Sequence, residues 1–349
     1  MSRRIIVIGV FSLFYFGLLI YPAVRILTLS FPTLQLTTPL LLVIMVAPLA
    51  GRLAHEWFPT RFTRWLSAVV LTWLGVCFVG FGAVLIFEVL NLLIVLDQQV
   101  AGWTLAGITA LISTYGFVNA QRLTVANVDI PAPEYLRGIT LAQISDVHIG
   151  SRSGRFLNRI VDRTNALKPN YVLITGDLVD FSNISQRELS ALADLNAPTY
   201  AIIGNHERYV DLEATCDRWT SLGVTVLRDD SVDLGQIQLV GIDDADTKTQ
   251  VQTKLAELMP IDDRYRILLY HRPDGAGAAA DWGFDLMLCG HTHNGQIFPF
   301  NYLVKRYFRH IRGTYRIDNL HLYVSSGTGT WGPIMRLGSR SEIGMIRLY

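Results

Sequence analysis

The chain has 349 residues, of which half are apolar and 17% are charged, and its formal net charge is +1. Soluble domains carry about 25% charged residues, so this deficit indicates a membrane part. It excludes a purely soluble enzyme, a disordered protein and a small disulfide scaffold. A net charge near zero gives no general case for nucleic-acid binding. Cys77, Cys216 and Cys289 are scattered, which fits neither a disulfide framework nor a thiolate zinc site.

The charge deficit is confined to the first third of the chain. Residues 1–122 hold seven Lys or Arg and three Asp or Glu, whereas residues 123–349 hold 23 and 26. We therefore expect a membrane anchor over residues 1–122, an extended linker over 123–137 and a globular domain over 138–349.

Four apolar stretches in the anchor have the composition of membrane-spanning helices. They cover residues 5–27, 37–54, 65–96 and 100–120. A spanning helix needs about 20 apolar residues, so the first, second and fourth each fit one crossing. The third is too long for one upright helix and too short for two, and we interpret it as one long or tilted helix. A signal peptide is the alternative for the first stretch, but its apolar run is long and further spans follow.

Positive charges beside the spans predict their orientation. The relevant residues are Arg3, Arg4, Arg52, Arg61, Arg64 and Arg122. Four spans with both termini in the cytoplasm satisfy this pattern, but a double crossing by the third stretch would move the globular domain to the other side. Glu88 interrupts the third stretch. It is either a functional carboxylate within the membrane or, as we favour, a residue near the interface.

The globular domain alternates β-branched apolar runs with helix-like segments. The expected strands are 139–145, 171–175, 199–203, 224–227, 231–234, 237–242, 266–270, 284–288, 320–325 and 343–348. The expected helices are 155–167, 184–195, 212–222, 248–258 and 276–281. Alternation followed by runs of strands predicts an α/β domain with mixed sheets.

Chemically active side chains follow five of the predicted strands. The motifs are Asp146-Val147-His148, Gly176-Asp177, Gly204-Asn205-His206, His271 and Gly290-His291-Thr292-His293. Sites in open α/β sheets are built at the carboxyl ends of strands. Carboxylate, imidazole and amide donors suit Mn²⁺, Fe, Zn²⁺ or Mg²⁺. Each motif alone is compatible with an ordinary turn, but five in order, each after a strand, predict one joint metal site.

This ordered set resembles the calcineurin-like metallophosphoesterase superfamily over about residues 138–349. The resemblance implies a four-layer αββα sandwich with mixed sheets and two divalent metals at one edge, with Mn²⁺ expected first. It implies that one metal binds Asp146, His148, Asp177 and His293, and the other Asp177, Asn205, His271 and His291. His206 resembles the family's non-ligand histidine beside the phosphate. Asp180 and Glu207 resemble residues that orient ligands, although a surface role for Glu207 is equally open.

The implied reaction is hydrolysis of a phosphoester or pyrophosphate. Two cations about 3.5–4 Å apart clamp a phosphoryl group and lower the pKa of a bridging water, whose hydroxide then attacks phosphorus in line. Asp177 and His206 are the expected catalytic residues, the latter as a general acid or a stabiliser of the transition state.

Two features bear on the substrate. The first is the anchor, and the second is the acid-free segment 286–317, which interleaves Lys305, Arg306 and Arg309 with aromatic residues. Such a segment suits lipid phosphates and headgroups, with a solvated surface loop as the alternative. Asn294 and Arg336 are further candidates for contact with the substrate. The glycine-rich segment 325–338 that holds Arg336 is equally compatible with a plain return to the last strand.

The membrane layout and the segments 325–329 and 335–338 resemble bacterial membrane-bound metallophosphoesterases of the YkuE/YaeI type. Some relatives with multi-span anchors are UDP-2,3-diacylglucosamine pyrophosphatases of lipid A synthesis. The resemblance therefore favours a lipid-linked substrate at a bacterial inner membrane, with the catalytic domain on the cytoplasmic side. The alternatives are a tethered phosphatase or phosphodiesterase for soluble substrates or phosphoproteins, a non-catalytic metal-binding sensor, and a nuclease or cyclic-nucleotide phosphodiesterase. The anchor argues against duplex nucleic acid as a partner.

Overall fold

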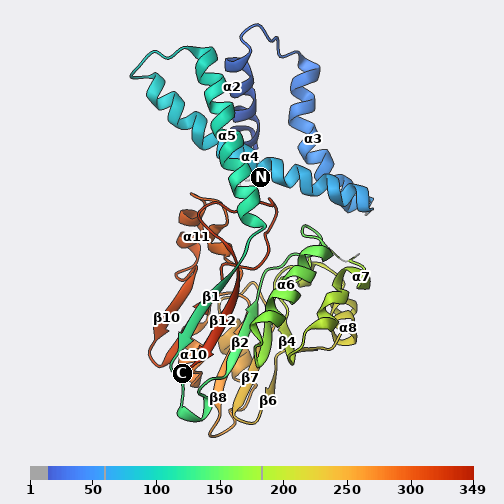
Figure 1. Ribbon diagram of the computed structural model, residues 1–349, viewed down its shortest axis with the longest axis vertical. Coiled ribbons are helices and arrows are strands. Elements are labelled where there is room, and N and C mark those ends of the chain that lie inside the picture. The colour runs from blue at the N-terminus through green and yellow to red at the C-terminus, as the bar shows by residue number, and fades with distance from the viewer. Residues whose placement is uncertain (1–14, 59, 182–183) are drawn as a thin grey trace, which may run out of the picture. The chain divides into compact units, whose positions relative to one another are not determined.

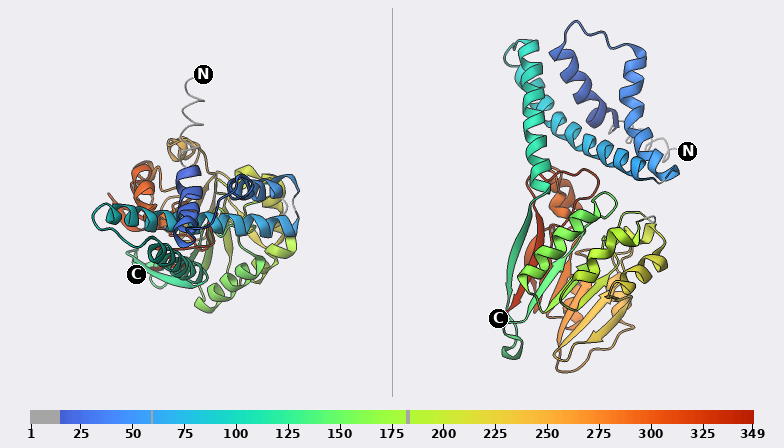
Figure 2. Two further views of the ribbon diagram at one scale, coloured as in Figure 1. Left: turned by 90° about the horizontal axis from the view of Figure 1, so that it is seen from above. Right: turned by 45° about the vertical axis from the view of Figure 1, so that its right-hand side comes forward.

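The computed structural model describes residues 15–58, 60–181 and 184–349. The chain divides into two compact units (Figures 1 and 2). The helical unit comprises the residues up to Val118 together with Gly332–Met335. The second unit comprises Asn119–Trp331 and Arg336–Tyr349, and we call it the catalytic unit because it contains the residues predicted to be catalytic. Arg3 and Arg4, which contribute to the predicted orientation, lie outside the described residues.

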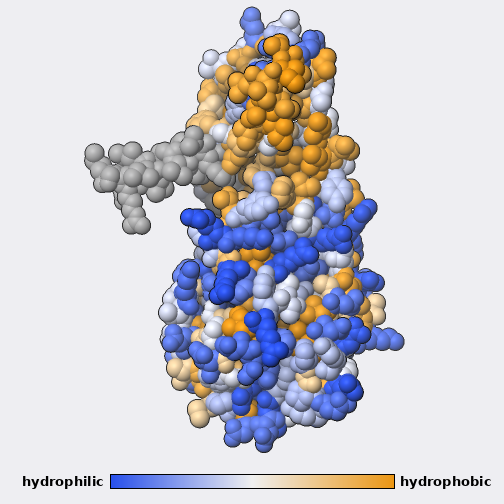
Figure 3. Space-filling view, turned by 90° about the vertical axis from the view of Figure 1, so that its left-hand side faces the viewer, coloured by the Kyte–Doolittle hydropathy of each residue, from blue (hydrophilic) through white to orange (hydrophobic). Residues whose placement is uncertain are grey.

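Apolar helices build the helical unit. A π-helix at Tyr15–Ile20 leads into α2 (Tyr21–Ser30), followed by α3 (Thr38–Trp57), α4 (Arg61–Asn91) and α5 (Gln98–Ala120). By length and composition α3, α4 and α5 can each cross a membrane, and Tyr15–Ser30 is a shorter apolar helix. The face of this unit that Figure 3 shows is mostly hydrophobic. The third apolar stretch is one continuous helix of 31 residues, as predicted.

Glu88 of α4 has a charged partner on α2. Arg25 Nε lies 2.6 Å from Glu88 Oε1, and the Tyr21 hydroxyl donates a hydrogen bond to the same oxygen at 3.1 Å. An acid on an apolar helix is tolerated when a cation compensates its charge. Glu88 therefore forms an ion pair that joins α4 to α2.

We predict that Arg25→Leu destabilises the helical unit, because it leaves the Glu88 carboxylate without its cation. The loss should be about 1 kcal/mol, since side chains that are 30% and 31% exposed are partly screened by solvent. The double variant Arg25→Leu/Glu88→Leu should recover most of the stability. Thermal unfolding of the protein in detergent measures both, and a double variant as unstable as the single one would contradict the pairing.

Two six-stranded mixed sheets form the centre of the catalytic unit (Figure 1). The first sheet has the order β1-β12-β2-β3-β4-β5 and the second β10-β11-β9-β8-β7-β6. The first contains β1 (Leu123–Ile130), β2 (Thr140–Ile144), β3 (Tyr171–Thr175), β4 (Thr199–Ile202), β5 (Val224–Val226) and β12 (Ser341–Leu348). The second contains β6 (Asp230–Asp233), β7 (Ile237–Ile242), β8 (Tyr265–Tyr270), β9 (Leu286–Cys289), β10 (Gly313–Ile317) and β11 (Leu320–Val324).

Helices cover the outer face of each sheet, which completes four layers. The helices α6 (Gly154–Leu167), α7 (Gln186–Leu189) and α8 (Leu212–Ser221) pack on the first sheet, and α9 (Gln250–Leu255) and α10 (Ala276–Trp282) on the second. Side chains such as Leu141 and Ile267 fill the space between the sheets. Central strands are buried on both faces and therefore have continuous apolar sequences. The αββα sandwich confirms the predicted fold.

Three segments differ from the sequence prediction. The expected linker 123–137 begins with β1, which pairs in parallel with β12 from Leu123 opposite Ser341 to Ile130 opposite Leu348. The expected helix 184–195 is the short α7 followed by a 3₁₀ turn at Ser190–Asp194. The segment 286–317 also contains α11 (Asn301–Tyr307) and the edge strand β10, neither of which was predicted. The partner of β1 is far along the chain, so little local signal marks that strand. The edge strand β10 pairs with the adjacent β11, but it has no buried residue and therefore no apolar run that would indicate a strand.

Candidate metal centre

The predicted metal ligands and the residues expected to assist them follow strands of the two sheets. In the first sheet, β2 leads to Asp146 and His148, β3 to Asp177 and Asp180, and β4 to Asn205 and His206. In the second sheet, β8 leads to His271, and β9 to His291 and His293. Because β2, β3 and β4 run parallel, as do β8 and β9, their carboxyl ends within each sheet lie at one edge.

Several site residues have an unusual backbone conformation. Asp146, His148, Asp177, His291 and His293 have φ between 48° and 69°. This left-handed region is unfavourable for residues that carry a Cβ atom, and such strain concentrates at functional sites. The surrounding fold therefore imposes the turns that aim these side chains.

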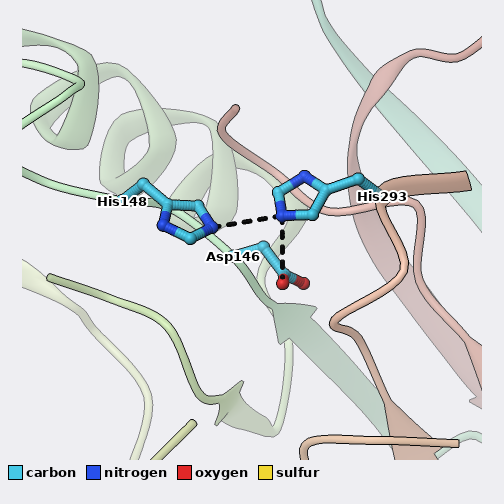
Figure 4. A group of neighbouring side chains, drawn as sticks. All are labelled: Asp146, His148 and His293. Carbon is cyan, nitrogen blue, oxygen red and sulfur yellow. Dashed lines mark hydrogen bonds and ion pairs between the residues drawn. The ribbon is translucent and has the colours of Figure 1, made fainter. Parts of the chain in front are cut away.

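Asp146, His148 and His293 form a first cluster that could hold a metal ion (Figure 4). His293 Nε2 lies 3.1 Å from His148 Nε2 and 3.3 Å from Asp146 Oδ1. His148 Nδ1 donates to Asp180 Oδ1 at 2.7 Å, which orients the ring so that Nε2 faces the cluster.

Asp177, His271 and His291 form a second cluster of the same kind. His271 Nε2 lies 3.1 Å from Asp177 Oδ2 and 3.2 Å from His291 Nδ1. His271 Nδ1 donates to the carbonyl of Thr175 at 2.8 Å, so the inward Nε2 is the ring nitrogen left to face the cluster. Burial opposes protonation of His271, but the charges of Asp177 and Asp146 raise its pKa to about 10, and a cation bound here would displace that proton.

Asp177 belongs to both clusters by position. Its Oδ2 lies 3.1 Å from His271 Nε2 of the second cluster and 3.8 Å from His148 Nε2 of the first. Its Oδ1 accepts the backbone N–H of His206 at 2.8 Å. A carboxylate in this place could serve both clusters if each held a cation.

The donor set fits divalent cations. Two pairs of imidazole nitrogens face each other at 3.1 and 3.2 Å, and a neutral ring supplies only one N–H. The side-chain oxygen of Asn205 is buried and has no hydrogen-bond partner in the described part of the chain. Converging ring nitrogens and an orphaned buried acceptor are what a bound cation would satisfy, and nitrogen and oxygen donors suit Mn²⁺, Fe, Zn²⁺ or Mg²⁺.

Two buried acids orient the ligands. Asp180 Oδ1 receives both His148 Nδ1 at 2.7 Å and His206 Nδ1 at 2.9 Å. Glu207 is fully buried and accepts the backbone N–H groups of Asp177, Val179 and Gly204 at 2.8–3.0 Å. The surface location considered for Glu207 is therefore wrong, and its carboxylate ties the turns after β3 and β4 together.

Burial and neighbouring charges shift the proton affinities in the site. Burial opposes ionisation of Asp177, but the positive charges of the protonated His271 and His206 rings hold its pKa well below the usual value. Burial opposes protonation of His206, but its hydrogen bond to Asp180 and the charge of Asp177 raise its pKa to about 9. Burial and the neighbouring His271 lower the pKa of His291 to about 3, which keeps that ring neutral and able to bind a metal.

Arg336, a predicted substrate contact, is completely buried. Its guanidinium donates to the carbonyls of Gly327 and Gly329 at 3.1 and 2.7 Å and lies 3.4 Å from His293 Nδ1. The loop that it holds donates from Gly329 N to the carbonyl of Asp146 at 2.9 Å. Arg336 thus fastens a loop behind the first cluster. Direct phosphate binding stays a prediction, which this burial does not favour.

The other predicted substrate contacts lie near the second sheet's histidines. Asn294 is half-buried in the turn after His293, and Lys305, Arg306 and Arg309 are exposed on α11 and just after it. The Phe308 ring contacts the His291 ring at a centroid distance of 5.2 Å. The end of α11 therefore adjoins the second cluster.

Sequence reasoning missed four charged residues beside the site, namely Arg208, Asp244, Asp246 and Arg272. The sequence contained a signal for the two arginines, because Arg208 is two residues from His206 and Arg272 directly follows His271. Their aspartate partners lie on a different loop, so only the folded chain shows the connection.

We predict that Gly204→Ala disrupts the centre. A Cβ atom at Gly204 would lie 2.6 Å from Asp177 N and would also clash with Asp177 Oδ1, so the shared carboxylate must move. Mn²⁺ affinity should fall about tenfold or more, as when the support of a ligand is lost. Gly277→Ala is the matched control, since its Cβ would have nothing within 4 Å. Metal analysis after dialysis and thermal unfolding measure the effect, and retention of full Mn²⁺ affinity would contradict this geometry.

The chain is similar to known metallophosphoesterases. The family model for calcineurin-like phosphoesterases matches residues 139–295. An uncharacterized metallophosphoesterase of Aquifex aeolicus is 33% identical over 259 residues, which cover 69% of this chain and 97% of that protein. A transmembrane protein with metallophosphoesterase domain from Danio rerio is 36% identical over 267 residues, or 68% of this chain and 60% of that protein. Phosphodiesterase YaeI of Escherichia coli is 33% identical over 202 residues, or 52% and 71%.

The chain spans 63% and 60% of the length of the first two curated relatives that it matches. The Aquifex protein, in contrast, is matched over nearly its whole length. The catalytic unit has the fold and the clustered donors described above. The chain belongs to the calcineurin-like phosphoesterase family, whose members are phosphoester hydrolases that bind two divalent metals.

Proposed function

We propose that this protein is a membrane-bound phosphodiesterase or pyrophosphatase for a lipid-linked phosphate, such as UDP-2,3-diacylglucosamine. One observation carries the proposal, which is that the candidate metal centre adjoins an exposed basic and aromatic surface on α11. We call this the α11 surface and define it by Tyr302, Leu303, Lys305, Arg306, Tyr307 and Arg309.

The residues of the two clusters have separate tasks in this proposal. Asp146, His148 and His293 would hold one divalent metal, proposed to be Mn²⁺, and Asn205, His271 and His291 the other, with Asp177 shared. When bound, two such cations polarise the phosphoryl oxygens and activate water. His206 is 20% exposed and bonded through Nδ1 to Asp180, which leaves Nε2 to donate to the leaving oxygen.

The chemistry of the α11 surface supports a lipid substrate. Tyr302, Leu303 and Tyr307 are 62%, 54% and 77% exposed. In the part of the chain that the structure describes, Lys305 and Arg306 form no ion pair, and residues 286–317 contain no acid. A cation near an anionic membrane surface contributes about 1 kcal/mol, and tyrosines favour the interface. We therefore propose the bilayer and its phosphate headgroups as partners.

The apolar helices support a membrane location. We propose a bacterial inner membrane with the catalytic unit on the cytoplasmic side. Arg61 and Arg64 lie at the start of α4 and Arg122 just after the end of α5, and two successive crossings would place these ends on the same side of the membrane. Positive charges favour the cytoplasmic side. The relative from Danio rerio is named as a transmembrane protein, which is consistent with an anchored phosphoesterase.

We expect the purified protein in mixed micelles with Mn²⁺ to release UMP from UDP-2,3-diacylglucosamine. Asp177→Ala should lower the rate by at least a factor of about 10³, because it removes the ligand that both metals would share. A soluble aryl phosphodiester is assayed beside the lipid. Cleavage of the aryl ester alone would keep the phosphodiesterase and overturn the lipid assignment, whereas cleavage of neither would overturn the proposed function.

We expect the double variant Arg306→Gln/Arg309→Gln to raise KM for the micellar lipid about tenfold, because two cations near the headgroups are lost. The kcat and the hydrolysis of the soluble ester should stay unchanged. Arg264→Gln is the control, since it removes a partly exposed arginine at the opposite end of β8 from His271. An equal loss on both substrates would assign these arginines to the centre instead of the lipid.

A further inference from the structure

A cluster of two arginines and two aspartates lies beside the candidate metal centre and has no part in the function proposed above. Arg208 is in the 3₁₀ turn Glu207–Tyr209, just after His206. Arg272 directly follows His271, and Asp244 and Asp246 lie in the loop after β7. We call these four residues the arginine–aspartate clamp.

Each aspartate of the clamp binds both arginines. The Asp244 carboxylate is fully buried and accepts Arg208 Nη1 at 2.9 Å, Arg272 Nε at 2.6 Å and Arg272 Nη2 at 3.0 Å. Asp246 accepts Arg208 Nη2 at 2.9 Å and Arg272 Nη2 at 2.7 Å. Charge-assisted bonds to a planar guanidinium fix direction as well as distance, so the four groups form a stiff unit.

The clamp connects the two sheets. Arg208 follows β4 of the first sheet, whereas Asp244, Asp246 and Arg272 follow strands of the second. The sheets come close here, because a Cβ atom on Gly241 of β7 would lie 2.7 Å from the Ile202 side chain of β4. The clamp therefore spans a close approach between the sheets near the edge that carries the site.

The clamp also holds a loop that is anchored on its other side. Glu207 bonds to the backbone of Asp177, Val179 and Gly204 within the first sheet, while Arg208, the next residue, reaches the second sheet. Asn205 and His206 stand directly before these two anchors. Their position relative to the second sheet thus depends on Arg208.

The second metal site of the proposed function needs this connection. It takes Asn205 from the loop after β4, and His271 from the end of β8, where Arg272 follows. The first cluster takes residues that follow β2 and β9, and neither of these strand ends carries a clamp residue. We propose that the clamp positions Asn205 and His271 relative to each other, and so sets the metal affinity of the second site and not of the first. This inference rests on the two-metal centre proposed above.

The test is Mn²⁺ titration of the full-length protein in detergent, followed by electron paramagnetic resonance. Arg208→Gln removes the ion pairs that join the two sheets but leaves the pair between Asp244 and Arg272. One of the two sites should then bind Mn²⁺ about 10–100-fold more weakly, and the other should be unchanged. In a His148→Ala background, which impairs the first site, the remaining site should be the one that Arg208→Gln weakens.

Two further variants grade the effect. Arg208→Lys keeps the charge but loses the two-nitrogen fork, so its affinity should lie between those of the wild type and Arg208→Gln. Asp246→Asn changes only the solvent-exposed aspartate of the clamp, so it should weaken the second metal site less than Arg208→Gln does. This variant tests the positioning role even if Arg208→Gln fails to fold. Arg264→Gln, which breaks an exposed ion pair with Asp233, should change neither site.

The outcomes separate this inference from the proposed function. Equal weakening of both sites, or none, would overturn the positioning role. Two-step Mn²⁺ binding with the predicted selective loss would support it, even if no phosphoester is hydrolysed and the proposed function fails. A wild-type protein that binds fewer than two Mn²⁺ would overturn the two-metal centre and this role together.

Discussion

The catalytic unit depends on holding buried imidazoles and carboxylates within contact distance of one another. Burying ionisable groups is costly unless each finds a partner, and here the partners are other ligand groups. The Nε2 atoms of His148 and His293 lie 3.1 Å apart, although a neutral imidazole has only one N–H with which to form a hydrogen bond. The left-handed turns, the loop under Arg336 and the buried Glu207 all serve this convergence.

Convergence requires two sheets, because neither carries a full set of donors. The first sheet contributes Asp146, His148 and Asp177, and the second contributes His271, His291 and His293. An apolar core between the sheets holds them face to face but is not directional. Directional contacts between the sheets, such as the pair Arg208–Asp244, can set the register of opposite strand ends to within the tolerance of a metal site.

The ligand motifs could be recognised in the sequence because each occupies one short stretch of the chain. A strand, a turn and one or two polar residues occupy fewer than ten consecutive positions, and strand ends gather in α/β sheets by rule. The edge strand β1 could not be predicted from the sequence, since its partner β12 lies more than 200 residues away. Gly329 is likewise far along the chain from the Asp146 carbonyl that it contacts, so only the folded chain shows that Arg336 holds the loop beside this ligand.

By itself the sequence determined the reaction class, the candidate ligands and the presence of long apolar helices, because these depend on residue type and local spacing. The tertiary structure decided which groups face one another. It decided that Asp177 lies between the clusters, that Glu207 is buried, and that Arg25 meets Glu88 across two helices. Such pairings depend on how distant segments pack, and packing between elements is not encoded in any single stretch of chain.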